Sequence, residues 1–404
     1  MKQTFRIICF ALFSFLFTSC HDNTVSPKQL NPPGYQQDIP WPSLADSPWP
    51  MNHHDPQNTG RSNYLAPVSG QVIKKIPASN MECGLSLGSD TTVLLATSGS
   101  HNLCKLTYNG DTLWKYDLGG NNIYTTPLVA NDGTIYIARS SVMAIDKNGT
   151  LKWSFQPDNE GALGLSLSID KAGNIYAYDW SDYLYIIDKA GKLITKTLLP
   201  DFQQTQDNLL VFSPDGKTIY YRSKNSSITA FSLVTNDALW HFGVTPLGVS
   251  PIVDCNGNVY ILQGDAHHNP ASFICISSSG QKIWNFDFQN TFFTYDTDPT
   301  IDKNGNTFFG IDTLYSLNWS GQLRWKKDLG GYMIYSPIVS DRDGKVIVAL
   351  AKNDNKIVCF DTNGNLLWEI TDAAERSPGY SPALSQNGFL FYPFFRSHNF
   401  FVIQ

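Results

Sequence analysis

The chain carries little charge and no excess of basic residues. Charged residues make up 16% of its 404 residues, and the formal net charge is −6, whereas typical soluble domains contain about 25% charged residues. Without a surplus of Lys and Arg, binding of nucleic-acid phosphates through overall basicity is excluded. The composition also argues against disorder, and an aromatic fraction of 13% favours a β-rich, exported protein.

Long hydrophobic runs are also missing. The main apolar stretch, residues 7–17, has 11 residues, and a membrane-spanning helix needs about 20. It follows Lys2 and Arg6 and ends just before Cys20, as in a signal peptide with a bacterial lipobox, although Phe17 stands where Leu is usual. We therefore expect lipidation at Cys20, and an ordinary secretion signal stays open as the alternative.

Residues 21–48 contain six prolines and show no apolar periodicity. Such a composition is typical of a semi-extended spacer. The sequence thus predicts a lipoprotein signal peptide at residues 1–19, a Pro-rich tether at residues 20–48 and a folded domain at residues 49–404. It also predicts that the folded domain does not depend on residues 21–48 for its stability.

A turn followed by a tryptophan recurs along the folded part. Six tryptophans lie four residues after a turn glycine, or after Asn236 in one copy, and a degenerate copy ends at Thr195. The six are Trp114, Trp153, Trp240, Trp284, Trp325 and Trp368. Successive anchor positions are 39, 42, 45, 44, 41 and 43 residues apart. Because periodic aromatic residues usually belong to the core, we expect these side chains to pack between repeats rather than to bind a ligand.

Each repeat has room for four short strands separated by Gly turns. In one repeat, residues 250–253, 258–262 and 272–276 read as three strands, and the strand with the tryptophan follows. Four short strands in about 40 residues are the signature of a β-propeller blade. The Asp and Asn residues of the turns could suggest calcium loops, but they lack the spacing of an EF-hand and stabilise turns by themselves.

The chain ends allow the blades to be counted. Three strands fit after Trp368, at residues 381–385, 389–394 and 399–404, and a fourth is missing. Residues 70–74 have the same turn pattern, with Lys74 at the tryptophan position. The sequence therefore predicts an all-β, eight-bladed β-propeller whose last blade is closed by an N-terminal strand, which removes exposed strand edges.

The repeat with a Gly-x-x-x-Trp motif, together with residues 49–62 (WPMNHHDPQNTGRS), resembles the PQQ-repeat or quinoprotein-like propeller superfamily. One branch of that superfamily contains PQQ-dependent dehydrogenases. The other contains scaffold propellers, including the lipoprotein subunit of the outer-membrane β-barrel assembly machinery. The resemblance is specific for the fold and says little about function.

The dehydrogenase branch implies adjacent cysteines over the quinone and ligands for calcium. No two cysteines of this chain are adjacent; they are Cys9, Cys20, Cys83, Cys104, Cys255, Cys275 and Cys359. Nor do they show the spacing of a zinc site. We therefore expect no cofactor, no metal site and no catalytic residue. The five cysteines after Cys20 are an odd number, so at least one thiol stays unpaired within the chain.

Functional residues are expected in loops on one face of the ring, where the second-to-third strand loops and the blade connections meet. The candidate partner-binding residues there are His101, Asp182, Tyr183, His267, His268, Tyr332, Tyr380 and His398. Because aromatic residues are enriched at interfaces, we interpret this surface as a site for an envelope protein, a peptide or a glycan.

These observations favour a membrane-tethered, non-catalytic and monomeric propeller scaffold in the bacterial cell envelope, attached to the membrane only by its lipid. The alternative is a reduced quinoprotein-type oxidoreductase, or a propeller hydrolase or lyase that uses loop His and Asp residues. A nucleic-acid partner is not expected.

Overall fold

The structure is a computed structural model. It describes residues 31–404 except 121–122, 159–162, 164–165, 204–208, 245–248, 266–267, 290–296, 332, 334–337, 351–354, 372–378 and 395–396, and it leaves out the side chains of 265 and 268–270. Residues 1–30, which contain the predicted signal peptide and Cys20, therefore lie outside the described residues, as do His267 and Tyr332. The folded unit spans Pro33–Gln404.

Every regular element in the described ranges is a β-strand. Blades 1 to 4 contain β2 (Ser86–Leu87), β3 (Thr92–Thr97), β4 (Asn102–Thr107), β5 (Thr112–Asp117); β6 (Leu128–Val129), β7 (Ile135–Ala138), β8 (Val142–Ile145), β9 (Leu151–Phe155); β10 (Ser168–Ile169), β11 (Ile175–Tyr178), β12 (Tyr183–Ile187), β13 (Leu193–Leu198); β14 (Val211–Phe212), β15 (Thr218–Ser223), β16 (Ser227–Ser232), β17 (Asp237–Gly243).

Blades 5 to 8 contain β18 (Ile252–Val253), β19 (Val259–Asp265), β20 (His268–Ile276), β21 (Lys282–Phe288); β22 (Thr300–Ile301), β23 (Thr307–Gly310), β24 (Thr313–Leu317), β25 (Leu323–Asp328); β26 (Val339–Ser340), β27 (Val346–Leu350), β28 (Lys356–Phe360), β29 (Leu366–Thr371); β30 (Ala383–Leu384), β31 (Leu390–Pro393), β32 (Asn399–Ile403), β1 (Val72–Pro77). No helix among the described residues has the length and apolar character needed to cross a membrane.

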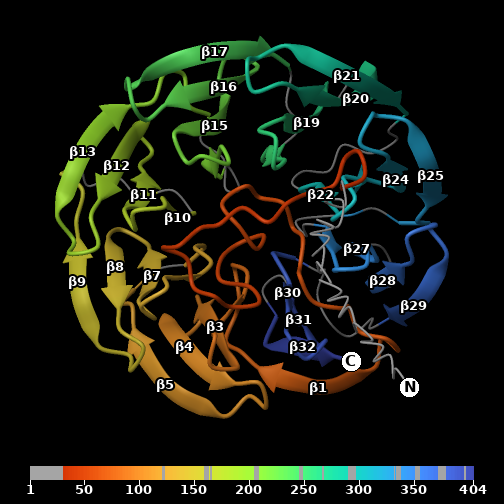
Figure 1. The fold of residues 1–404 in the computed structure, drawn as a ribbon. Coiled ribbons are helices and arrows are strands. Elements are labelled where there is room, and N and C mark those ends of the chain that lie inside the picture. Colours follow the sequence, from red (N-terminus) through yellow and green to blue (C-terminus); the bar gives the residue numbers. More distant parts are fainter. Residues whose placement is uncertain are drawn as a thin grey trace, which may run out of the picture. The chain divides into compact units, whose positions relative to one another are not determined.

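The strands form eight antiparallel four-stranded sheets arranged around a central channel (Figure 1). In each blade a two-residue strand lies nearest the channel, and the strand that bears the anchor position lies on the rim. Side chains of β2 to β4 and their equivalents are buried between neighbouring blades. The all-β, eight-bladed propeller predicted from the sequence is confirmed.

The N-terminal strand closes the ring. β1 pairs with β32, and the last sheet has the order β1-β32-β31-β30. In its register Lys74 lies opposite Val402 and Ile76 opposite Phe400. The ring is therefore fastened by a strand that is more than 300 residues away in the sequence, and closure hides the edge of β32.

Each anchor tryptophan covers the turn glycine of the next blade. A Cβ added to Gly364 would lie 2.7 Å from Trp325 Cδ2, and one added to Gly149 would lie 2.8 Å from Trp114 Cδ2. The indole Nε1 of Trp325 also donates to the Thr362 carbonyl, at 2.9 Å. The spacing of the repeat therefore has a physical cause: only glycine leaves room for the indole, and its positive φ also forms the turn.

At the closing blade two residues, Lys74 and Ile76, make the contacts that a single tryptophan makes in other blades. Lys74 Nζ donates to the carbonyl of Asn109 at 2.5 Å, as an indole N–H does elsewhere. A Cβ on Gly110 would meet the side chain of Ile76 at 2.9 Å. The sequence pattern identifies Lys74 as the substitute but does not reveal that Ile76 supplies the packing.

The turn aspartates hold their own backbone. Asp302 Oδ1 accepts the N–H groups of Asn304 and Asn306, both at 2.8 Å, and Asp361 makes the same pair of bonds in its turn. This geometry is that of Asx-type turns.

The five cysteines in the described ranges are all free. Burial raises the pKa of Cys83, Cys275 and Cys359 to about 12, so these thiols are poor nucleophiles.

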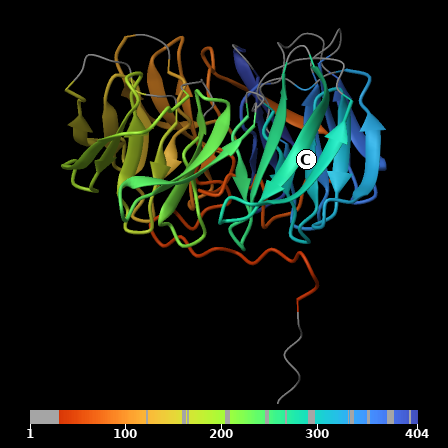
Figure 2. The same ribbon diagram turned by 90° about the horizontal axis from the view of Figure 1, so that it is seen from above.

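Residues 33–48, which the sequence assigns to the tether, are part of the folded unit and are called the strap here. Trp41 is 9% exposed, packs edge-on against Phe212 with ring centroids 5.4 Å apart, and donates from Nε1 to the Ile169 carbonyl at 2.9 Å. Further bonds connect Gln36 to Lys303 and Ala45 to Val129. The strap thus runs across several blades on one face (Figure 2).

Candidate functional sites: the loop face and the channel mouth

The loop face contains the second-to-third strand loops and the connections between blades. His101 and Asp182 lie in such loops with φ of 54° and 69°. Their carbonyl groups accept the N–H groups of Leu118 and Leu199, at 2.8 and 2.9 Å. The carbonyls of Ser226 and Asp312 accept equivalent bonds from Val244 and Leu329. The backbone at His101 and Asp182 therefore has a repeated structural role, and only the side chains differ between blades.

Asp182 also connects two blades. Its carboxylate lies 2.5 Å from Lys224 Nζ, and the Lys224 N–H donates to the Asp201 carbonyl at 2.6 Å. On the same blade, Lys196 Nζ lies 4.6 Å from the centre of the Tyr183 ring. Nearby, Trp180 is 46% exposed although it is one of the largest apolar side chains. Blade 3 therefore presents an exposed aromatic side chain next to charged groups.

The remaining loop candidates lie apart. The His398 carbonyl accepts the N–H of Ala78 at 2.6 Å, which connects the end of β1 to the start of β32 within blade 8. Tyr380 has a φ of 69°. His268 begins β20, which forms the longest hairpin of the ring together with β19. No group of three or more His, Cys, Asp or Glu side chains suited to a metal occurs among the described residues.

The opposite face is occupied by the lead-in segment, residues 49–62. Its carbonyl groups accept an N–H from the last residue of one innermost strand after another. The pairs, given as acceptor then donor, are Trp49 with Leu87, Pro50 with Val129, Pro56 with Phe212, Gln57 with Val253, Thr59 with Ile301 and Gly60 with Ser340, at 2.7–3.2 Å. The lead-in segment thus binds six blades through backbone groups that strand pairing leaves free.

The turn within the lead-in segment lies inside the ring of innermost strands. His53 is fully buried; its Nδ1 lies 2.8 Å from Asn58 Oδ1 and its Nε2 lies 3.0 Å from the Ile338 carbonyl. The Asn58 amide nitrogen donates to the Pro251 carbonyl, at 3.0 Å, so its oxygen faces His53. His53 thus connects Asn58 to the Ile338 carbonyl through its two ring nitrogens.

The Asp298 carboxylate belongs to the same cluster. It accepts the Ser250 N–H at 2.8 Å and lies 3.4 Å from the Asn58 amide nitrogen. Burial raises the pKa of Asp298, and the charge of His53 opposes that shift. His53, Asn58 and Asp298 thus connect the lead-in segment to the channel wall through satisfied hydrogen bonds, which is a structural arrangement.

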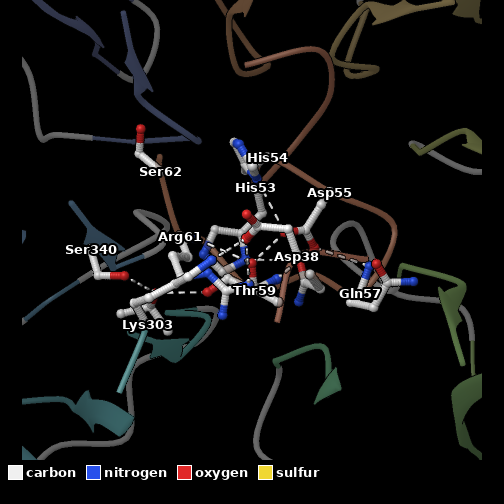
Figure 3. Close-up of polar contacts among 12 residues, drawn as sticks. Asp38, His53, His54, Asp55, Gln57, Thr59, Arg61, Ser62, Lys303 and Ser340 are labelled. Carbon is white, nitrogen blue, oxygen red and sulfur yellow. Dashed lines mark hydrogen bonds and ion pairs between the residues drawn. The ribbon is translucent and has the colours of Figure 1, made fainter. Parts of the chain in front are cut away.

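A second polar cluster lies where the lead-in segment leaves the channel (Figure 3). Asp55 accepts the N–H groups of Gln57 and Thr59, each at 3.1 Å, and the Thr59 hydroxyl. Burial alone would raise the pKa of Asp55. The hydrogen bond from His54 and the other contacts outweigh burial and hold this pKa below its ordinary value. Beside it, Arg61 lies 3.8 Å from Asp38, which also pairs with Lys303 at 2.6 Å.

The sequence reasoning did not select these lead-in residues. Residues 52–61 form a dense run of hydrogen-bonding side chains (NHHDPQNTGR) directly after a Pro-rich stretch. A polar run with no charge excess and no strand alternation is a signal of side chains committed to a buried network. The individual partners come from six different blades, and no local pattern identifies them.

The comparisons with known proteins agree with this architecture. The family model described as outer membrane protein assembly factor BamB matches residues 64–241 and 272–390, which is most of the chain. The chain belongs to this family. No curated protein matches it. Membership in the BamB family points to a scaffold or assembly role, to protein interaction in general and to association with the cell envelope.

Solved structures share the fold at low sequence identity. BamB from Moraxella catarrhalis is 14% identical with a TM-score of 0.61, covering 83% of this chain and 97% of that one. Quinohemoprotein alcohol dehydrogenase from Comamonas testosteroni is 10% identical with a TM-score of 0.65, covering 88% and 80%. The computationally designed Ika8 protein is 12% identical with a TM-score of 0.62, covering 85% and 100%. At these identities the likeness concerns the fold alone.

A calcium-bound quinone, as in the dehydrogenase branch, does not fit the residues present. The buried Asp298 carboxylate is already committed to Ser250 and Asn58. Asn58 is held in turn by the fully buried His53. The carboxylate and the amide of this cluster are therefore committed to protein partners rather than to a calcium ion.

Proposed function

We propose that the protein is a lipid-anchored, non-catalytic propeller that binds a protein partner during the assembly of outer membrane proteins. The observation that carries this proposal is the BamB family match, which covers residues 64–241 and 272–390, from before the closing strand into the last blade. The match therefore concerns most of the ring rather than a single repeat. The finer parts of the proposal are the lipid at Cys20, the partner and the face that binds it.

The loop face is the surface that we assign to the partner. The opposite face is covered by the strap and the lead-in segment, which already use the free backbone groups of the innermost strands. On the loop face, Trp180 exposes an apolar ring beside the Asp182–Lys224 pair, and blade 5 has the longest hairpin. An aromatic side chain surrounded by charged groups is the usual composition of a binding hot spot.

Membrane attachment is tested by Cys20→Ala. We expect the variant to lose incorporated acyl label and to move from the membrane to the soluble fraction, because several acyl chains are needed for stable anchoring. The measurement is fractionation together with metabolic labelling by palmitate. Cys255→Ala is the matched control, since Cys255 is a free cysteine in the folded unit, and it should keep label and location. Unchanged labelling of Cys20→Ala would contradict the anchor.

The binding face is tested by a pair of tryptophans with nearly equal exposure. Trp180 on the loop face is 46% exposed, and Trp319, whose side chain contacts Gly34 of the strap, is 49% exposed. A photo-crosslinking residue at position 180 is expected to capture an outer membrane assembly protein, identified by mass spectrometry, and one at position 319 is not. Capture only from position 319 would move the site to the opposite face.

Loss of function is tested on the same face. The triple variant Trp180→Ser, His267→Ser, His268→Ser, which carries no crosslinker, is expected to lose co-purification of the captured protein while its melting temperature stays unchanged. Substitutions at exposed positions such as Trp180, which is 46% exposed, usually alter stability by about 0.5 kcal/mol or less. Normal co-purification with the triple variant would exclude these loops as the contact.

A further inference from the structure

Arg61 is a buried cation with too few partners. The residue is 6% exposed, and its Nη1 is enclosed without a hydrogen-bond partner among the described residues. Among the described residues its guanidinium forms one ion pair, from Nη2 to Asp38 Oδ1 at 3.8 Å, which is too long for a hydrogen bond. A guanidinium carries five N–H donors in a planar fork, and burying it with so few acceptors costs free energy.

The carboxylates near Arg61 are already engaged by other groups. Lys303, from the turn after β22, places Nζ 2.6 Å from the same Asp38 oxygen, and its side chain is mostly buried. The other nearby carboxylate, Asp55, is already bonded to Gln57, Thr59 and His54. Two cations therefore share one carboxylate, and that carboxylate, at 59% exposed, is the most accessible group of the cluster (Figure 3).

We propose that Arg61 and Lys303 form a binding site for an oxyanion, a carboxylate or a phosphate group, which Asp38 of the strap occupies in part as an internal ligand. A planar guanidinium binds both classes of oxyanion through two parallel hydrogen bonds, whereas Asp38 approaches one nitrogen at long range. An external oxyanion replaces Asp38, bonds Arg61 and Lys303 together, and leaves the Asp38 carboxylate in water.

This assignment makes Asp38 a competitor of the ligand. The strap is held at the same turn by the bond from Gln36 N to the Lys303 carbonyl, at 2.9 Å, so the backbone near Asp38 stays in place when the carboxylate leaves. Removing the charge of Asp38 should therefore strengthen ligand binding. Removing Lys303 should weaken it, because one of the two cations is lost. These opposite effects distinguish a built site from general attraction to a basic surface.

The experiment titrates the purified protein with inorganic phosphate and, in a separate arm, with acetate, at constant ionic strength. Binding is followed by isothermal titration calorimetry and by the shift in melting temperature. Asp38→Asn is expected to bind at least tenfold more tightly than the wild type, and Lys303→Met at least tenfold more weakly. Arg342→Met is the matched control, since Arg342 occupies the equivalent turn position in blade 7 and pairs with Asp343, and it should bind as the wild type does.

Arg61 itself is not substituted, because its side chain is enclosed and its replacement would disturb folding. The Asp38 and Lys303 variants are sufficient to test the proposal. Binding of phosphate alone identifies a phosphate site, binding of acetate alone a carboxylate site, and binding of both an oxyanion site of general character. Each of these supports the proposal if the Asp38 and Lys303 variants change affinity in opposite directions. Absence of binding in both arms, equal affinity of all variants, or an equal loss in Arg342→Met overturns it.

Discussion

Deleting residues 33–48 is expected to destabilise the propeller, whereas deleting residues 21–32 is expected to leave its melting temperature unchanged. The strap buries Trp41 against Phe212 and forms backbone bonds to several blades. Truncation of a buried tryptophan alone costs about 3–5 kcal/mol, and the lost hydrogen bonds add to that. Thermal and urea unfolding of both deletions measure the difference.

Two further variants sharpen this test. Trp41→Ala should reproduce most of the loss caused by deleting the strap, and Trp180→Ala should not, because Trp180 is 46% exposed. A deletion of residues 21–76 should be worse than either, since it also removes β1 and uncovers β32. Equal melting of the 21–32 and 33–48 deletions would show that the strap contributes nothing to stability.

The sequence predicted the blades but not the packing of the strap, because only the blades repeat. A blade repeats, so its turns, its strand alternation and its tryptophans recur at a fixed period, and eight blades closed by an N-terminal strand follow from that period. The strap contacts several blades, each through different groups, such as Trp41 on Ile169 and Gln36 on Lys303. An extended segment of this kind has no period, so its prolines suggested a free tether.

The same distinction holds for the candidate sites. The loop residues can be assigned to loops from the sequence because turn glycines and alternating strands lie on both sides of them. The sequence does not show that the carbonyls of His101 and Asp182 accept hydrogen bonds from the backbone of the following connection. The Arg61 cluster joins the strap, the lead-in segment and blade 6. The charged side chains of three segments that are distant in the sequence come together there only when the ring is closed. Their spacing in the sequence therefore does not predict that they are neighbours.

The contact between tryptophan and glycine should be the most sensitive point of the repeat. Gly364 and Gly133 have nearly equal φ, 78° and 81°, but a Cβ on Gly364 would lie 2.7 Å from Trp325 Cδ2, while one on Gly133 would lie 3.5 Å from its nearest neighbour, Lys147. Both Gly→Ala variants should lose about 1–2 kcal/mol through left-handed backbone strain. Gly364→Ala should lose roughly 1–3 kcal/mol more, because it overpacks the indole.

A double-mutant cycle with Trp325→Ala isolates that extra loss. Trp325 is half-buried and donates to the Thr362 carbonyl, so its truncation alone should cost somewhat less than the about 3–5 kcal/mol of a fully buried tryptophan. In the Trp325→Ala background, Gly364→Ala should cost only the backbone strain, as Gly133→Ala does, because no indole remains to collide with the new methyl group. Urea unfolding of the four proteins gives the coupling energy. If Gly364→Ala costs the same with and without the indole, the spacing of glycine and tryptophan reflects turn formation alone and not contact between blades.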